Sequence, residues 1–149
     1  MKIIISFLIF AFSINYNPSL AVSYARKYCQ YYNKAYIYYP EDVFKNDNAN
    51  FVSQCLLAGG QNLKGCPNIN SNGLIPSVSS LRSCLQQKGW KSSKTKPPSF
   101  KAGYPMITLD LSSAIIATKV VGNTTYYCSH TPDVCDRILS SKLYYYFYL

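Results

Sequence analysis

The sequence is poor in the residues that build metal sites. It contains one histidine, His130, and none of its six cysteines form a C-x-x-C pair. Zinc sites are usually built from clustered cysteines and histidines at such spacings. We therefore expect no metal site and no cofactor. Internal repeats and low-complexity tails are also absent from the sequence, which argues against a solenoid or a disordered extension.

Long apolar runs are scarce too. The only one covers Ile3 to Phe12, directly after Met1-Lys2, and it ends in the small-x-small pattern Ala11-Phe12-Ser13. This arrangement is typical of a secretory signal peptide and is too short to span a membrane. The sequence therefore predicts a signal peptide over residues 1–13, followed by one secreted, extracellular domain over residues 14–149 without a membrane span.

Acidic residues are few: six Asp and Glu stand against 15 Lys and Arg, giving a formal charge of +9. A basic exported protein can be attracted to anionic cell walls, polysaccharides or membranes, but we favour a solvated surface as the explanation of the charge. Because no arginine-rich strip interleaved with aromatic residues occurs, we expect no nucleic-acid partner. The sequence does not indicate an oligomeric state.

The even number of cysteines favours disulfide bonds in an exported chain. Six cysteines allow 15 pairings, and the sequence alone does not choose among them. Two of them flank a turn and can close a local loop, Cys128 and Cys135. The candidates for disulfide formation are Cys29, Cys55, Cys66, Cys84, Cys128 and Cys135.

Helical patterns occupy the first two thirds of the chain. Asn17 can cap a helix with Pro18 at its first position, and apolar residues recur at helical spacing through residue 32. A second helix is expected at about 48–58. A third begins at Val78 and stops at Gly89. The connection over 61–76 is a loop that we expect Cys66 to pin.

The remainder favours strands, because it is rich in β-branched and aromatic residues. We expect strands at 104–109, 113–121, 124–129 and 138–148, with Gly122-Asn123 as a hairpin turn and 92–101 as a linker. Helices followed by an antiparallel meander indicate an α+β fold. Asn123 begins the sequon Asn-Thr-Thr, which makes it a candidate glycosylation site.

The most specific stretch runs from Asn46 to Gly60. It predicts a short buried helix whose first turn can be capped by Asp47, Asn48 or Asn50, and Gly59-Gly60 supplies the exit. The N-terminus of a helix lowers the pKa of a thiol, so many hydrolases place a nucleophilic cysteine there.

Three stretches, in order, resemble the putative amidase domain family of small exported proteins. They are Tyr16 to Ala25, Asn50 to Gly60, and His130-Thr131-Pro132-Asp133. The family is related to papain-like cysteine hydrolases and cell-wall peptidases. The resemblance implies a papain-like α+β fold, with a central buried helix packed on a small antiparallel sheet, and amide-bond hydrolysis.

The resemblance also implies where the catalytic residues should lie. The family motif begins Asp-Cys-x-Asn-Phe-Val-Ser with a nucleophilic cysteine, and the matching residue here is Asn48. The catalytic histidine precedes an aliphatic run, which places Ser113 at the position of the base. His130 matches the third residue, which orients the base. An amide is not a comparable nucleophile, and serine cannot replace imidazole as the base.

Cys55 is not a substitute nucleophile. It follows Asn48 by two helical turns and lies roughly 10 Å farther along the axis, beyond hydrogen-bond reach of the same pocket. We expect it to pack in the core or to form a disulfide.

The leading hypothesis is a catalytically degenerate amidase-like domain, a pseudoenzyme that binds a peptide or a peptidoglycan-like cell-wall fragment in the old cleft. The ligand-binding candidates are Asp47, Asn48, Ser113 and His130. One alternative is an active amidase or peptidase in which His130, with Asp133 or Asp110, activates water. A structural or surface-coat protein is a third hypothesis.

Overall fold

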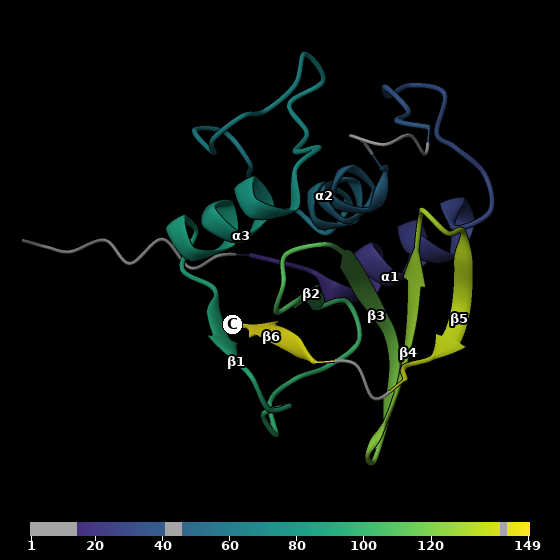
Figure 1. The fold of residues 1–149 in the computed structure, drawn as a ribbon, viewed down its shortest axis with the longest axis vertical. Helices are drawn as coiled ribbons and strands as arrows, with labels where there is room; N and C mark the ends of the chain where they lie inside the picture. The colour runs from purple at the N-terminus through teal and green to yellow at the C-terminus, as the bar shows by residue number, and fades with distance from the viewer. Residues whose placement is uncertain (1–14, 41–45, 141–142) are drawn as a thin grey trace, which may run out of the picture.

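The computed structural model describes residues 15–40, 46–140 and 143–149. In these residues three helices and a six-stranded antiparallel sheet form the α+β fold predicted from the sequence (Figure 1). The helices are α1 (Pro18–Tyr28), α2 (Asn48–Ala58) and α3 (Val78–Gln87). The strands are β1 (Lys91–Ser93), β2 (Pro105–Thr108), β3 (Ala114–Val121), β4 (Thr124–Ser129), β5 (Val134–Ile138) and β6 (Tyr144–Tyr148).

Helix α1 begins as predicted and ends earlier. Asn17 Oδ1 accepts hydrogen bonds from the backbone N–H groups of Ser19 and Leu20, and Pro18 occupies the first helical position. The prediction that the helix continues to residue 32 is wrong. The Tyr28 carbonyl lies 2.6 Å from His130 Nε2, so its acceptor site is used by a tertiary contact instead of a further helical turn.

Helix α2 has the predicted bounds and is the centre of the molecule. Its residues from Asn48 to Leu56 are all buried. It packs against α1, α3, β3 and β4. The chain leaves it through Gly60, whose φ of 90° lies in the left-handed region that favours glycine.

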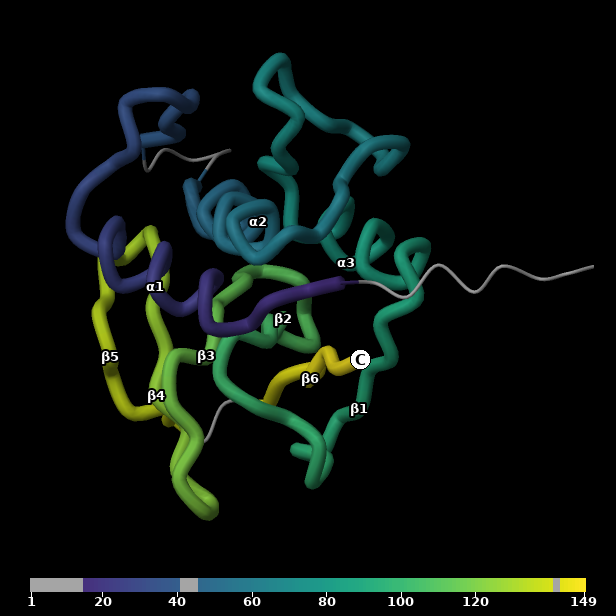
Figure 2. The backbone as a smooth tube through the Cα atoms, turned by 180° about the vertical axis from the view of Figure 1, so that it is seen from behind, coloured from purple at the N-terminus to yellow at the C-terminus, as the bar shows by residue number. Residues whose placement is uncertain are grey.

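The segment before α1 runs along the back of the molecule beside the end of α2 (Figure 2). The Asn17 N–H donates to the Gly59 carbonyl at 2.7 Å, and the Tyr16 hydroxyl donates to the Gly103 carbonyl at 2.6 Å. A Cβ at Gly59 would collide with the Tyr16 ring. Residue 59 must therefore be glycine for this segment to pack here.

The sheet has the strand order β1-β6-β2-β3-β4-β5. The first three predicted strands are confirmed to within a residue or two, and the β3–β4 hairpin turns at Gly122-Asn123. The Asn123 side of this hairpin tip is exposed, and glycosylation there stays a prediction.

The end of the chain differs from the prediction. The single strand expected at 138–148 is wrong: β5 ends at Ile138, and β6 begins at Tyr144. The simple meander is also wrong, because β6 inserts between β1 and β2 and pairs with both. The expected linker at 92–101 therefore contributes the edge strand β1, which hydrogen-bonds to a partner more than fifty residues later in the sequence.

Two disulfides join Cys29 to Cys135 and Cys66 to Cys84. The second pins the loop before α3, as predicted. Cys55 and Cys128 are buried free thiols, so their candidacy for disulfide formation is wrong, as is a Cys128–Cys135 loop. Cys55, on α2, is fully buried in the core. The partner of Cys135 is Cys29, the residue directly after α1, which no local spacing reveals.

The predicted signal peptide, residues 1–13, lies outside the described residues. Among the helices that are described, none is long and apolar enough to cross a membrane.

Candidate functional site

The family-matching position Asn48 is the first residue of α2. Its side chain is 2 % exposed, and its Oδ1 accepts a hydrogen bond of 3.2 Å from the backbone N–H of Ala114, the first residue of β3. The Asn48 N–H itself is bonded to Asn46 Oδ1 at 3.3 Å. The Asn48 amide therefore fixes the start of the helix to the start of the strand, and does not cap the helix.

Ser113 directly precedes that contact. Its backbone N–H donates to Thr108 Oγ1 at 3.0 Å, and its carbonyl accepts from the Thr108 N–H at 3.0 Å, which closes the turn between β2 and β3. The side chain is partly exposed. The structure thus brings Asn48 and Ser113 to adjoining positions, although they are 65 places apart in the sequence.

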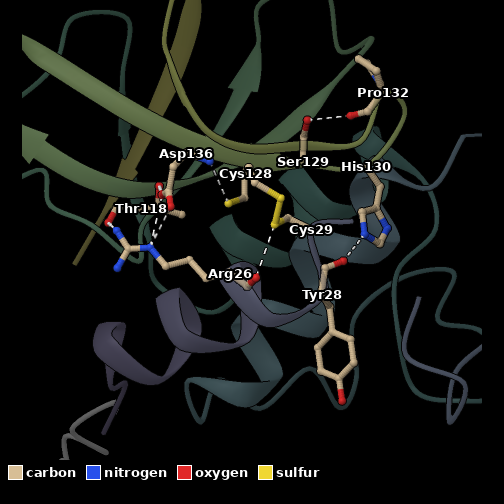
Figure 3. Close-up of a disulfide and its surroundings, with 10 residues drawn as sticks. Arg26, Tyr28, Cys29, Thr118, Cys128, Ser129, His130, Pro132 and Asp136 are labelled. Atoms are coloured by element: carbon tan, nitrogen blue, oxygen red, sulfur yellow. Dashed lines mark hydrogen bonds and ion pairs between the residues drawn. A yellow bond between two sulfur atoms is a disulfide. The ribbon is translucent and has the colours of Figure 1, made fainter. Parts of the chain in front are cut away.

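His130 is buried in the core and contacts Asp47, the residue directly before Asn48. Its Nδ1 is 2.6 Å from Asp47 Oδ2. Its Nε2 is 2.6 Å from the Tyr28 carbonyl oxygen, a contact that Figure 3 shows. The imidazole stacks on Phe51 with ring centroids 4.0 Å apart. The side chain is 1 % exposed.

This geometry leaves His130 without a free nitrogen. Both ring nitrogens face oxygen acceptors, so the ring is either an imidazolium beside the Asp47 carboxylate or a neutral ring beside a protonated Asp47. In both arrangements each ring nitrogen is already in a short hydrogen bond. Neither is available to take a proton from a substrate.

Asp47 is the central polar residue of this region. Its Oδ1 accepts from the Tyr39 N–H at 3.1 Å and from Asn50 Nδ2 at 2.9 Å, while its own N–H donates to Thr131 Oγ1 at 3.0 Å. Asp47 occupies the N-cap position, but its carboxylate makes no capping bond to the helix. The prediction of a cap is wrong at this residue because the carboxylate is committed to His130 and to the segment around Tyr39.

Sequence reasoning missed the Asp47–His130 pair. The two residues are 83 positions apart, and no periodicity or short motif links them. The only available signal was the presence of one histidine and one acidic residue in two separate motifs of the same resemblance.

A cavity of about 650 Å³ opens on the sheet next to Ser113. Strands β2 to β6 each contribute to its wall, through Thr108, Ile115, Tyr127, Arg137 and Tyr144. Hydroxyl groups are frequent around it, including those of Ser112, Ser113, Ser129 and Thr131. The lining therefore combines hydrogen-bonding groups, aromatic rings and one guanidinium group.

The other three ligand-binding candidates, Asp47, Asn48 and His130, do not line this cavity. Asp47 and His130 border only a crevice that has no room for a water molecule, under Tyr32 and Tyr38. A second cavity, of about 510 Å³, is lined by Asn46 and by the start of α3, and it meets the first at Ser112. Asn48 lines none of these three spaces.

Strand alternation explains the separation of Asn48 from the larger cavity. Successive side chains of a strand point to opposite sides, so Ile115 faces the cavity while Ala114 and Ile116 face away from it. Ala114 and Ile116 are fully buried, and α2 packs on β3. Ser113, just before the start of the strand, is the one predicted ligand-binding residue that lines the cavity.

Two ionisable groups in the larger cavity have shifted pKa values. Hydrogen bonds from Ser112 lower the pKa of Asp110, which keeps this carboxylate ionised at neutral pH. Burial raises the pKa of Tyr144 to about 12, so its hydroxyl remains a donor. With Arg137 the cavity therefore presents an anion, a cation and neutral hydroxyls.

The free thiol Cys55 is an unsuitable nucleophile, as expected. It is completely buried, and this desolvation is the main cause that raises the pKa of its thiol well above the usual value. Among the described residues, the metal-ligating side chains that cluster are Cys29, Cys128 and Cys135, of which two are joined as a disulfide.

Comparison with known families identifies the chain. The model of the Putative amidase domain family matches residues 15–104, more than half of the 149 residues. The match contains α1, α2 and α3, and it ends before Ser113 and His130. No match was found among curated protein sequences or among solved structures. This chain belongs to the Putative amidase domain family.

Proposed function

We propose that this protein is an exported, papain-like member of its family that has lost hydrolytic activity and binds a peptide or a cell-wall fragment. The observation that carries the loss of activity is the state of Asn48. Its amide is buried and bonded to the Ala114 N–H, at the helix N-terminus where the family motif has its cysteine. An amide in this position supplies no thiolate.

The chain also offers no evident base at this position. The neighbouring Ser113 has a hydroxyl where imidazole is expected, and the only histidine has both ring nitrogens engaged. Cysteine hydrolases need a base to prepare the thiolate and later to protonate the leaving group. On this proposal, neither the nucleophile nor the base has a suitable residue, and only the role of orienting the base has a matching residue, His130.

The larger cavity supports a binding role. Its Arg137 suits a carboxylate, its hydroxyl groups suit amide and sugar oxygens, and Tyr127 and Tyr144 offer aromatic surface. Ser113 links this cavity to the old catalytic position. A short peptide, free or attached to a glycan, has all three kinds of group.

Binding is tested by titrating the chain, residues 14–149, with cell-wall peptide fragments in a calorimeter. We expect saturable binding that Arg137→Ala weakens by about tenfold, since one charge-assisted contact is worth about 1.4 kcal/mol or more. Lys91→Ala is the matched control, because it removes a cation from β1, at the opposite edge of the sheet. Equal affinity in both variants, or no binding at all, contradicts the proposed cavity.

The alternative function, an active amidase or peptidase, would require His130 with Asp133 or Asp110 to activate water. The carboxylate that His130 contacts is Asp47, and Asp133 accepts instead from the Tyr32 hydroxyl at 3.1 Å. Asp110 lies in the cavity, but its lowered pKa makes it a poor general base at neutral pH. These observations favour binding over turnover.

Hydrolysis is tested with peptide amides and with peptidoglycan, using a family member that retains the cysteine as the positive control. We expect no product above the buffer background. Turnover that disappears in Asp110→Asn, or in a folded His130→Ala variant, would establish the active enzyme and end the proposal of lost activity. Far-UV circular dichroism of each variant shows whether it is folded.

A further inference from the structure

The thiol of Cys128 lies beside a disulfide. Its sulfur and those of Cys29 and Cys135 are all within 4.8 Å of one another (Figure 3). Cys29 follows α1, Cys128 belongs to β4 and Cys135 belongs to β5, so three separate elements meet at this cluster. The cluster lies outside the cavity next to Ser113, and neither the disulfide nor the free thiol has a part in the binding role above.

Cys128 is well placed to bond to Cys135. Their strands are neighbours in the sheet, and in the β4–β5 ladder Tyr127 pairs with Arg137 and Ser129 pairs with Val134. The irregular register leaves Cys135 and Asp136 opposite Cys128, at the distance of a cross-strand pair. The Asp136 N–H already donates to Cys128 Sγ at 3.4 Å.

We propose that the Cys128 thiol exchanges with the Cys29–Cys135 disulfide, so that the bond moves to Cys128–Cys135 and the Cys29 thiol is released. Cys128 gives its proton to solvent, and its thiolate attacks Cys135 Sγ. The new sulfur–sulfur bond forms as the old one breaks, and the electron pair leaves on Cys29 Sγ, which takes up a proton. One disulfide and one thiol exist before and after, so no oxidant or reductant is needed.

Polar groups lie within reach of both the attacking sulfur of Cys128 and the leaving sulfur of Cys29. The Asp136 N–H, which donates to Cys128 Sγ, favours a thiolate there, whereas the Asp136 carboxylate opposes it and is itself paired with Arg26 at 3.2 Å. On the other side, the Arg26 carbonyl oxygen lies 3.4 Å from Cys29 Sγ. A sulfur in a disulfide has no proton to donate to this oxygen, whereas the released Cys29 thiol does.

Burial makes the exchange slow at neutral pH. Desolvation is the main cause that raises the pKa of the Cys128 thiol, and the negative charge of the Asp136 carboxylate raises it further, against the lowering effect of the Asp136 N–H, Arg26 and Thr118. Since the thiolate is the attacking species, the exchange rate should rise about tenfold per pH unit below that pKa.

The exchange changes what holds α1 to the sheet. In the present pairing the Cys29–Cys135 bond ties the end of α1 covalently to β5. After exchange, the covalent bond lies within the β4–β5 hairpin, and α1 keeps only non-covalent links to this region. Those links include the Arg26–Asp136 ion pair, the hydrogen bond between His130 and the Tyr28 carbonyl, and the packing of α1 against β4 and β5.

Peptide mapping distinguishes the two pairings directly. Cleavage after Lys and Arg places Cys29 in residues 28–34, and both Cys128 and Cys135 in residues 120–137. In the present pairing, the Cys29–Cys135 bond therefore joins these two peptides to each other. The exchanged pairing gives one internally looped peptide of residues 120–137 and a separate peptide of residues 28–34 with a free thiol.

The experiment incubates the oxidised protein in mildly alkaline buffer without added thiol, quenches it in acid and labels it with N-ethylmaleimide under denaturing conditions. We expect label on Cys29 to grow with time together with the looped peptide. Both signals should fall to background in Cys128→Ser. Cys55→Ser, which removes the other buried free thiol, is the matched control and should leave them unchanged.

Two results overturn the proposal. One is label that stays on Cys55 and Cys128 and never appears on Cys29, with wild type and Cys128→Ser giving the same crosslinked peptides. The other is a bond between Cys29 and Cys128, which a second cleavage before Asp133 separates from a bond to Cys135. The variant Cys29→Ser provides an independent check, because it must form the Cys128–Cys135 bond on oxidation.

Discussion

The two sides of strand β3 have opposite characters. On the side of α2, Asn48 is buried and bonded to the Ala114 N–H, and next to it the Asp47–His130 pair is sealed from solvent. On the other side, Ile115 faces a cavity of about 650 Å³ that Ser113 borders at the start of the strand. The start of β3 therefore contributes to a buried contact with α2 on one side and to the wall of an open cavity on the other.

Under the proposal of lost activity, the buried side of β3 accounts for how the fold can persist without a nucleophile. The helix N-terminus that favours a thiolate also tolerates an amide, provided that the amide finds a hydrogen-bond partner. Here the partner is a backbone N–H of the strand that should carry the base. This buried contact then contributes to stability, and a ligand can be bound by groups on the open side. The predictions below test this difference, beginning with the largest expected effect.

Breaking the buried pair should cost the most. Asp47→Ala leaves His130 without its carboxylate partner and removes the acceptor of the Tyr39 N–H. We expect the free energy of unfolding to fall by about 3–5 kcal/mol, the usual cost of removing one partner of a buried pair. Urea denaturation measures it. Asp133→Ala, an exposed carboxylate, is the control and should change stability by less than about 0.5 kcal/mol. Similar losses in the two variants would contradict a sealed pair.

Removing the Asn48 amide should have an intermediate effect. Asn48→Ala leaves the Ala114 N–H without its acceptor and creates a small void, so we expect a loss of about 1–3 kcal/mol in unfolding free energy. Ser113→Ala is the matched change on the open side. The Ser113 bonds to Thr108 are made by its backbone, and the loss should stay within about 0.5 kcal/mol. Equal losses would mean that the two sides of β3 do not differ as described.

Restoring the family residues would sharpen the comparison. The combined variant Asn48→Cys and Ser113→His tests whether an imidazole at position 113, which borders the cavity, can reach a thiol at the helix N-terminus. We expect the pKa of that thiol to be at least about one unit, or 1.4 kcal/mol, below that of Asn48→Cys alone. Ultraviolet absorbance of the thiolate measures the titration without requiring access to the buried position. If the thiols of both variants titrate together near the reference of about 8.5, the two positions are not catalytic neighbours.

The smallest expected effect is the loss of stability at high pH that comes from Tyr144, which lines the cavity. The pKa of Tyr144 is raised by burial from 10.0 to about 12, so its contribution to stability is complete below about pH 10 and is lost as the pH rises toward about 12. Tyr144→Phe has no proton to lose. Its unfolding free energy should therefore fall less steeply over this range than that of wild type, as measured by urea midpoints. Parallel curves would show that the Tyr144 hydroxyl is already solvated in the folded protein.

Much of the fold was predictable from local chemistry. The bounds of α2, the cap of α1 at Asn17 and the hairpin at Gly122-Asn123 follow from short-range signals, and each is confirmed. The placement of β6 was not predictable. Its tyrosine-rich sequence is compatible with any neighbour, and its position depends on pairing with β1 and β2, which are distant in the chain.

The candidate site was partly predictable. The family resemblance led to Asn48 and Ser113, and the structure places them at adjoining positions. His130 was expected to orient a base in the same site. Instead it lies in the core, because the acceptors that hold its two nitrogens come from Asp47 and from the end of α1. Local sequence could not reveal these partners.

The sequence by itself determined the α+β class, the central helix and its asparagine-rich first turn, because each depends on residue type and near neighbours. Tertiary structure alone decided which cysteines pair, where His130 finds its carboxylate and which side of β3 stays open. These outcomes depend on contacts between residues far apart in the chain, and side-chain burial and hydrogen-bond partners exist only once those residues are brought together.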